Sequence, residues 1–518
     1  MNAPSPSAVP GMRRNMVTIC AMTATIMQAL DTTIANVALP YMQGSLSASQ
    51  DQINWVLTSY IVAAAIMTAP VGWIANRYGR KRIFIICSAG FTIASVLCGL
   101  AQDINQMVLF RLLQGVFGAA LVPLSQAVML DSYALHERAK AMSIWGMGVM
   151  MGPIMGPSLG AWLTETYSWH WVFFVNLPFG FITVIGLMIF MDETRQDLNL
   201  RFDWFGFSAL AVGIGSLQLA LDRGEQLGWL ESNEIMIEFI VAAVGFYFFL
   251  AHSLTTDRPF IQFALFKDRN FLGGCVFMTV MGLVLYSTMA LSSPYLQNVI
   301  GYPIITAGLL LASRGFGTFV AMMLVGRMMR TFEARTLIIA GLTLTAASLF
   351  QMTGWTDMTQ APEIIIVSVI QGFGFGLVFV PLSTVAFLTL PGHLRTDGTS
   401  MLTLLRNVAS SVGISIVIAQ LTEGSRRIYA KLSEHINPFN HALQMPDVSR
   451  MINLNTDAGR AMADKMVAAQ SQIIAFSHDY QLVMLFILVS IPLAIMIGST
   501  KSTLRSQSEP SDHAAVME

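Results

Sequence analysis

Three polar side chains stand inside otherwise apolar stretches and could together bind and release a proton. Asp31 lies well inside the run that begins near residue 15, and Arg111 and Gln114 lie one helical turn apart in a later run. Loss of water disfavours a charged carboxylate, whereas a nearby cation favours it, so the two effects together allow proton exchange. Because arginine keeps its proton, we expect Arg111 to tune Asp31 or to take its place when a ligand arrives. A fixed structural ion pair is the alternative for Asp31.

Two further arginines, Arg314 and Arg406, also lie inside apolar runs. A charge in such a run is costly unless it meets water, a partner or a ligand. Both arginines are therefore possible further charges of an internal cavity. Structural pairing, or extension of the side chain to a polar interface, explains them equally well.

Glycines and prolines near residue 150 predict a bent helix with one flat face. The glycines recur every four residues, and two prolines are interleaved, as Gly148, Gly152, Pro153, Gly156, Pro157 and Gly160. Glycine at each turn lets another helix approach closely, and proline removes backbone hydrogen bonds. Ordinary helix packing explains many small-residue patterns, but this regular spacing with two prolines is more specific.

A short basic connection follows the second apolar run. Its residues that could form a turn or gate are Gly72, Asn76, Arg77, Gly79, Arg80 and Lys81. On charge alone, this connection could fix the topology of the chain or contact anionic lipid.

The composition indicates that the elements carrying these residues lie in a lipid bilayer. The chain is 54% hydrophobic and 11% charged, and its mean hydropathy is +0.61, which argues against a soluble enzyme. A bilayer core needs about 20 apolar residues per helix. We expect fourteen transmembrane helices, near 15–38, 53–73, 82–101, 106–129, 139–163, 170–191, 203–222, 233–254, 270–292, 303–326, 336–355, 363–388, 398–421 and 480–499.

The distribution of lysine and arginine predicts the orientation of these helices. Most of the basic residues fall on alternate connections, starting with the N-terminus. The positive-inside rule then places both termini in the cytoplasm and the long polar segment 422–479 outside. No binding of nucleic acid is expected, because 29 basic residues balance 30 acidic ones. The four cysteines lie in apolar runs without a C-x-x-C pair, so neither a zinc site nor a disulfide framework is expected.

An internal repeat predicts two similar halves. The sequence Val122–Ser125 recurs as Val380–Ser383, and Val71–Gly72 matches Val325–Gly326 at a similar offset. We expect an all-α membrane protein with two six-helix bundles and two inserted helices. The predicted parts are a cytoplasmic tail at 1–14, bundles at 15–191 and 270–499, inserted helices at 203–254 and a cytoplasmic tail at 500–518.

Taken together, these segments resemble the major facilitator superfamily, and specifically its fourteen-helix drug:proton antiporters of the EmrB/QacA type. The resemblance covers nearly the whole chain. The matching segments, in order, are Leu30–Pro40, Gly72–Arg82, Arg111–Gly118, Gly148–Gly160, Trp169–Gly180 and Leu405–Asn407. It implies that the arginine of the fourth helix takes part in proton coupling and that the glycine–proline pattern is the antiporter motif of the fifth helix.

Three residues depart from the family pattern. Asn76 stands where the loop motif usually has aspartate, which puts a charge-based latch between the halves in doubt. Ala161 replaces the usual last glycine of the fifth-helix motif, and His170 takes a place often held by arginine. We expect a structural role for His170 at the outer interface.

The resemblance implies proton-driven efflux of drugs or amphiphilic compounds across a bacterial cytoplasmic (inner) membrane, by alternating access. No cofactor is expected, and the sequence lacks the nucleotide-binding and metalloprotease motifs of a primary pump or a membrane enzyme. A proton-coupled nutrient symporter, or an exporter of one metabolite, is the nearest alternative on the same fold. A non-transporting receptor or scaffold would give Asp31 no purpose.

The long polar segment 422–479 has helix-forming character and could cap the exit. The resemblance also makes a periplasmic membrane-fusion adaptor and an outer-membrane channel possible partners. A solvated lid without partners is the alternative.

Overall fold

The computed structural model describes residues 11–494 except 195, 257–258, 438–439, 441–442, 444 and 446–452, and every long regular element in this part is helical. The predicted tail at 500–518 and residues 1–10 of the predicted N-terminal tail lie outside it. The helices before residue 200 are α1 (Gly11–Ser45), α2 (Gln50–Thr68), α3 (Val71–Tyr78), α4 (Arg80–Gly99), α5 (Ile104–Gly118), α6 (Leu121–Ser132), α7 (Arg138–Thr166), α8 (Trp171–Phe174) and α9 (Asn176–Phe190). Those that follow are α10 (Trp204–Leu227), α11 (Asn233–Thr255), α12 (Ala264–Lys267), α13 (Arg269–Pro294), α14 (Ile304–Thr331), α15 (Ala334–Met352), α16 (Ala361–Val385), α17 (Arg395–Ser433) and α20 (Asp457–Leu493).

Local sequence signals explain where several helices begin and end. A reciprocal capping box between Ser49 and Gln52 starts α2. Asp203 caps α10 by accepting a hydrogen bond from the Gly206 amide, and Gly228 ends that helix in the left-handed conformation that glycine tolerates best. The short helix α3 is separated from α4 by Gly79, whose φ is +96°.

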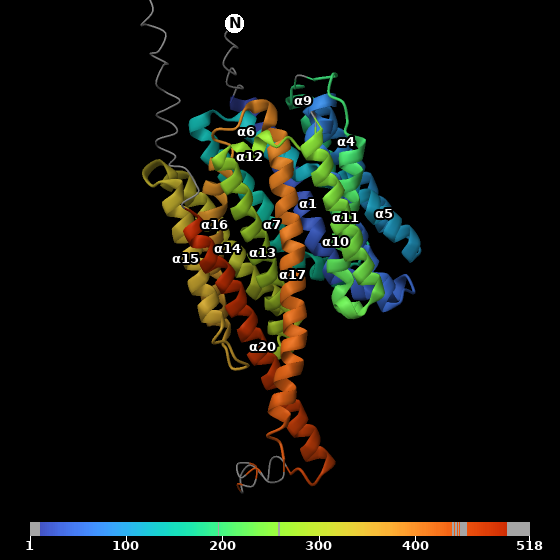
Figure 1. The fold of residues 1–518 in the computed structure, drawn as a ribbon, viewed down its shortest axis with the longest axis vertical. Coiled ribbons are helices and arrows are strands. Elements are labelled where there is room, and N and C mark those ends of the chain that lie inside the picture. The colour runs from blue at the N-terminus through green and yellow to red at the C-terminus, as the bar shows by residue number, and fades with distance from the viewer. Residues whose placement is uncertain are drawn as a thin grey trace, which may run out of the picture.

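The helices pack in two groups (Figure 1). In the first, α1 contacts α7, α9 and α6, while α5 packs against α2 and α4. In the second, α16 lies between α14 and α15, and α13 and α20 pack against α17. The groups meet where α7 contacts α14 and where α17 contacts α3 and α6. The pair α10 and α11 packs together, and α10 contacts both α2 and α17.

Twelve helices in the described part are long and apolar enough to cross a membrane, or thirteen when the bent pair α2 and α3 counts as one span. Fourteen spans are therefore not confirmed. The remaining expected span corresponds to α7. This helix has 29 residues, but it is less hydrophobic than the helices counted as spans. Its glycines and prolines lower its hydropathy, because neither residue contributes a large apolar side chain.

The segment 422–479 is helical at both of its ends. Helix α17 has 39 residues and continues to Ser433. Helix α20 has 37 residues and begins at Asp457. At a rise of about 1.5 Å per residue, each is much longer than a bilayer core of about 30 Å. Figure 1 shows both helices extending beyond the lower end of the other helices, and Tyr429 of α17 hydrogen-bonds Asp464 of α20 in this extension.

Candidate functional site

The acid predicted from the sequence lies at the centre of a buried polar cluster. Asp31 of α1 and Arg111 of α5 form an ion pair in which Nη1 and Oδ2 are 2.7 Å apart, and their side chains are 0% and 1% exposed. Gln114, one turn after Arg111, donates from Nε2 to the other carboxylate oxygen at 2.7 Å and accepts from Arg111 Nη1 at 2.8 Å. The structure thus brings together all three residues expected to handle the proton.

The guanidinium of Arg111 is held from several sides. Its Nε donates to the carbonyl oxygen of Val56 at 3.0 Å, and the ring of Tyr60 lies 4.3 Å from its central carbon. Both contacts come from α2. Gly115 makes this approach possible, since a Cβ at that position would lie 2.5 Å from the Tyr60 carbonyl oxygen. A lysine could not make this set of contacts, because it lacks the planar fork of donors.

A fourth member of the cluster, Asn176, was not identified from the sequence. It begins α9 and donates from Nδ2 to Asp31 Oδ1 at 3.1 Å and to Ser95 Oγ at 3.0 Å. Ser95 in turn donates to the carbonyl oxygen of Phe173 at 2.9 Å. The signal available was an asparagine inside an apolar run, in a segment already noted as typical of the family. Ser95 gives no such signal, because serine is common in membrane helices.

The glycine pattern of α7 lies against α1. A Cβ at Gly152 would meet backbone atoms of Ala29 at 2.2 Å, and one at Gly156 would meet Thr33 Oγ1 at 2.0 Å. Gly148 and Gly160 also face α1, at Met22 and Ile34. Thr33 donates to the Gly152 carbonyl oxygen at 3.0 Å. Pro153 and Pro157 lie within α7, which remains a continuous helix across both. This face of α7 therefore fixes the part of α1 that carries Asp31.

The other contact of α7, with α14 of the second group, is made mainly through side chains. Gly315 approaches the side chain of Ile154, Gly146 approaches that of Met322, and a Cβ at Gly308 would meet only Ser158 Oγ, at 3.5 Å. Inside the second group, by contrast, helices touch backbone to backbone, as where a Cβ at Gly372 would lie 1.8 Å from the Arg314 carbonyl oxygen. The contact of α7 with α14 is therefore made through side chains, without the backbone approach found at Gly372.

The basic connection after α2 joins the two groups at one end of the molecule. A Cβ at Gly72 would lie 2.0 Å from Asp397 Oδ1 in the first turn of α17. Asn76 donates from Nδ2 to Asp397 Oδ2 at 3.3 Å. The sequence puts a charge-based latch between the halves in doubt at Asn76. The structure has a hydrogen bond from its neutral amide at this position.

Arg80 provides a charged contact between the two groups at the same end of the molecule. It pairs with Asp131 at the end of α6, and the same carboxylate pairs with Arg395 of α17. Arg80 Nη2 also reaches the Gly392 carbonyl oxygen at 3.4 Å. Asp131 and Arg395 were not identified as site residues from the sequence, since nothing in their spacing relates them to each other.

The other residues of the basic connection serve the first group alone. Arg77 donates to the Leu200 carbonyl oxygen and lies over the rings of Trp73 and Tyr78. Lys81 donates from Nζ to the Met188 carbonyl oxygen at 2.9 Å. Gly79 is required by its positive φ and by the Glu193 carboxylate, which would lie 2.4 Å from a Cβ at that position.

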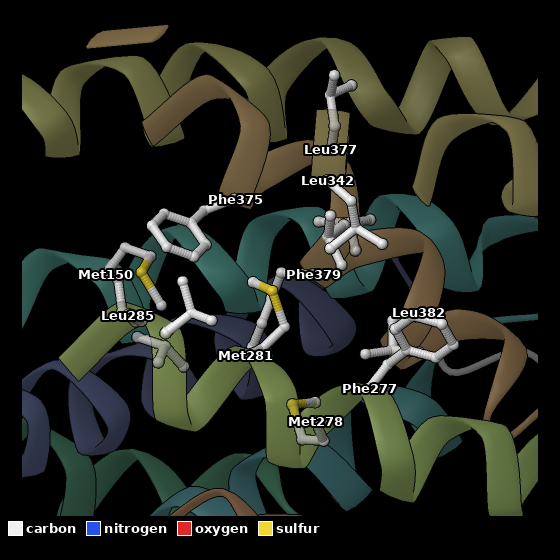
Figure 2. Close-up of a cluster of buried hydrophobic side chains, with 14 of the residues drawn as sticks. Met150, Phe277, Met278, Met281, Leu285, Leu342, Phe375, Leu377, Phe379 and Leu382 are labelled. Atoms are coloured by element: carbon white, nitrogen blue, oxygen red, sulfur yellow. The ribbon is translucent and has the colours of Figure 1, made fainter. Parts of the chain in front are cut away.

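A small apolar cavity of about 10 Å³ lies between α7 and the second group of helices. It is lined by Met150, Met281, Leu285, Tyr286, Thr318, Met322, Phe375, Phe379 and Arg406. Figure 2 shows Met150, Leu285 and Phe375 converging from α7, α13 and α16. Arg406 is the one charged residue of the lining, and its buried Nε has no hydrogen-bond partner within the described part of the chain.

Arg314, the other arginine predicted to lie in the membrane, is buried in α14 and does not line this cavity. Its Nη2 donates to Ser292 Oγ at 3.1 Å, and its Nε has no hydrogen-bond partner among the described residues. His170 lies just before α8, where its ring stacks on Trp169 with centroids 3.8 Å apart. Burial lowers the pKa of His170, and its Nδ1 lies 3.2 Å from Ser168 Oγ, which agrees with a structural role.

Comparison with known proteins identifies relatives over most of the chain. Residues 21–414 match the family described as Major Facilitator Superfamily. The multidrug export protein EmrB of Escherichia coli (strain K12) is 36% identical over 83% of this chain and 84% of its own length. The fatty acid resistance protein FarB of Neisseria gonorrhoeae is 34% identical over 82% of this chain and 84% of its own length. The crystal structure of the human organic anion transporter MFSD10 shares the fold, with a TM-score of 0.58 at 12% identity, covering 92% of this chain and 100% of that one.

Proposed function

The chain belongs to the major facilitator superfamily and is a membrane transporter rather than an enzyme, and we propose that it exports drugs or other amphiphilic compounds in exchange for protons. The observation that carries the proposal is the buried ion pair of Asp31 and Arg111, closed by Gln114 and Asn176. Such a pair gives little net stability, because the loss of hydration offsets the attraction between the charges. A proton-exchanging role explains why a costly pair lies inside an apolar bundle.

Asp31 carries the proton in this mechanism. When the carboxylate binds a proton, its attraction to Arg111 is lost, while Gln114 and Asn176 can still hydrogen-bond the neutral acid. Arg111 stays charged and is then free to seek another acceptor. Because α7 packs on α1 at Ala29 and Thr33, a shift of the Asp31 side chain acts on the helix that also faces the second group.

Alternating access is supported by the unequal packing within and between the groups. We propose that residues 15–191 and 270–499 form two bundles that rock about the contact of α7 with α14, with the helices at 203–254 inserted between them. The Asn76–Asp397 and Arg80–Asp131–Arg395 contacts would hold one end closed and break as that end opens. One proton crossing about 100 mV supplies about 2.3 kcal/mol, enough to drive export against a gradient.

We propose that the exported compound binds beside Arg406, where the cavity of about 10 Å³ must widen as the two groups of helices move apart. Methionine and phenylalanine provide polarizable apolar surface that adapts to different shapes. The Arg406 guanidinium, whose Nε has no partner among the described residues, favours an amphiphile that carries an anionic or strongly accepting group at one end. The name of FarB, a relative associated with resistance to fatty acids, is consistent with this preference.

We propose that α7 is a further span, so that the protein has fourteen, and that it lies in a bacterial cytoplasmic (inner) membrane with both termini in the cytoplasm. The orientation is supported by the basic residues of the α2–α4 connection. The extended ends of α17 and α20 would then lie in the periplasm. A membrane-fusion adaptor bound there, followed by an outer-membrane channel, is the corresponding proposal for partners.

Proton release from inverted membrane vesicles tests the proposed function. A cationic dye, a neutral amphiphile, an alkyl sulfonate and a sugar are added in turn to vesicles with the wild-type protein or with Asp31→Asn. Release that an amphiphile triggers in the wild type, and that is absent in Asp31→Asn, is the expected result. A response to the sugar alone would overturn drug export, and uptake of protons from the medium together with the sugar would favour a nutrient symporter.

A further inference from the structure

A second buried carboxyl group lies in the C-terminal half, far along the sequence from Asp31. Asp479 of α20 is 0% exposed, and neither of its carboxylate oxygens has a hydrogen-bond partner among the described residues. No ion pair reaches it within that part of the chain. An ionised carboxylate in such surroundings costs far more than a neutral one, so the group resolves the cost by binding a proton.

The groups around Asp479 supply no charge that would hold it ionised. On its own helix, His478 is exposed and Tyr480 is fully buried. The elements that pack most closely against α20 are α13, α15, α17 and Tyr295–Val299, and none of their charged groups hydrogen-bonds Asp479 within the described residues. Tyr480 is the titratable group next to Asp479 on α20, and its buried hydroxyl has no hydrogen-bond partner among the described residues.

Asp479 lies near one end of the helices that surround it. Ser477, two residues earlier, donates to the carbonyl oxygen of Thr353 at 2.7 Å, where α15 ends. Tyr295 donates to the Thr356 carbonyl oxygen at 2.7 Å at the same end of the bundle. Asp479 therefore lies near the end of the bundle at which α15 ends. Arg314 of α14 is a buried cation of the same group of helices, and its Nε has no hydrogen-bond partner among the described residues.

We propose that Asp479 is a second proton-exchanging site, which holds a proton in the conformation described here and releases it to water when the helices around it separate. The exchange breaks and reforms only the carboxyl O–H bond. Its use in transport rests on the proposed function, but the exchange itself does not require any substrate.

Infrared difference spectroscopy of the purified full-length protein, recorded over a series of pH steps, tests this proposal. A protonated carboxylic acid without hydrogen-bond partners gives a C=O stretch at unusually high frequency, and labelling with carboxyl-¹³C aspartate must shift it. The wild type is expected to show this band, and the band is expected to fall as the pH is raised. Asp479→Asn should remove the band and bind about one proton fewer per chain, whereas Asp31→Asn should keep it.

The absence of a label-sensitive high-frequency band in the wild type would overturn the proposal, as would a band that does not respond to pH or that survives in Asp479→Asn. The wild-type spectrum decides the question even if Asp479→Asn does not fold. Asp479→Glu, which keeps a carboxyl group on the same helix face, should restore a pH-sensitive band without the aspartate label shift. Because no substrate is added, failure of the proposed export function leaves these outcomes unchanged.

Discussion

The ion pair of Asp31 and Arg111 in the first group of helices and the buried charges at Arg314, Arg406 and Asp479 in the second differ in how completely they are hydrogen-bonded. In the first, Asp31 and Arg111 neutralise each other, and amide groups from α5 and α9 complete their hydrogen bonds. In the second, Arg314, Arg406 and Asp479 each keep at least one buried polar atom without a partner among the described residues. A satisfied cluster is rigid and holds one geometry, whereas unpaired groups respond to whatever ligand or proton arrives. The contrast supports the proposal that the first group holds the coupling site and that the second binds the transported compound.

Arg111→Gln should break the satisfied cluster and give the largest effect. It leaves Asp31 without its cation, so we expect a loss of about 3–5 kcal/mol in stability and loss of proton-coupled transport. Thermal unfolding in detergent and uptake into inverted vesicles measure the two effects. The double variant Asp31→Asn/Arg111→Gln should recover much of the stability but no coupling. An Arg111→Gln protein with wild-type stability would show that the pair is not buried as described.

Gly152→Ala should strain the packing that positions Asp31. Its new Cβ would meet backbone atoms of Ala29 at 2.2 Å, so the helices α1 and α7 must separate, at a cost of about 1–3 kcal/mol. The matched control is Gly308→Ala in α14, where the nearest atom is Ser158 Oγ at 3.5 Å. The unfolding temperature should fall for Gly152→Ala and stay the same or rise for Gly308→Ala. Equal effects would remove the distinction between tight packing within a group and looser packing between groups.

Arg406→Gln should act on ligand binding and leave the first group intact. We expect about a tenfold weaker affinity for an alkyl sulfonate, equivalent to about 1.4 kcal/mol, because a charge-assisted contact is lost. Affinity for a neutral alcohol of the same chain length should hardly change. Fluorescence titration of the purified protein with both probes gives the comparison. An equal loss for the two probes would mean that Arg406 shapes the cavity but does not bind the anionic group.

Asn76→Asp should give the smallest effect. It places a second carboxylate beside Asp397, so the closed end should weaken by about 1 kcal/mol. Amide hydrogen exchange in α3 and in the first turn of α17 should become several-fold faster. Adding Asp397→Asn should reverse the change, since the amide and carboxylate then exchange places. No acceleration in the single variant would show that this contact does not hold the end closed.

The coupling cluster was largely predictable from the sequence, because a charge inside an apolar run is rare and costly. Asp31, Arg111 and Gln114 were found in this way, and the structure places them in mutual contact. Asn176 and Asp131 were not found, since their roles depend on which helices meet, and a single sequence does not contain that information. Asp479 lay in a segment predicted to be an external loop, whereas α20 runs from Asp457 to Leu493 without a break.

The helical class of the fold was equally accessible, since apolar runs of sufficient length leave few alternatives. The number of membrane-spanning helices was harder to establish, as α7 shows. The regular glycines that let it approach α1 also lower the hydropathy by which spans are recognised. The extensions of α17 and α20 were underestimated because polar residues continue a helix as readily as they form a loop.

Exchange of protons for substrate requires that a proton on Asp31 and a compound bound beside Arg406 weaken each other's binding, and this coupling is the central claim. The affinity of the purified protein for a fluorescent alkyl sulfonate, measured as a function of pH, tests it most directly. The charge of this probe does not change with pH, so any pH dependence belongs to the protein. Wild-type affinity should fall as the pH is lowered, and Asp31→Asn should bind the probe with an affinity that no longer follows pH. An unchanged pH dependence in Asp31→Asn would contradict the account and move the coupling site away from Asp31.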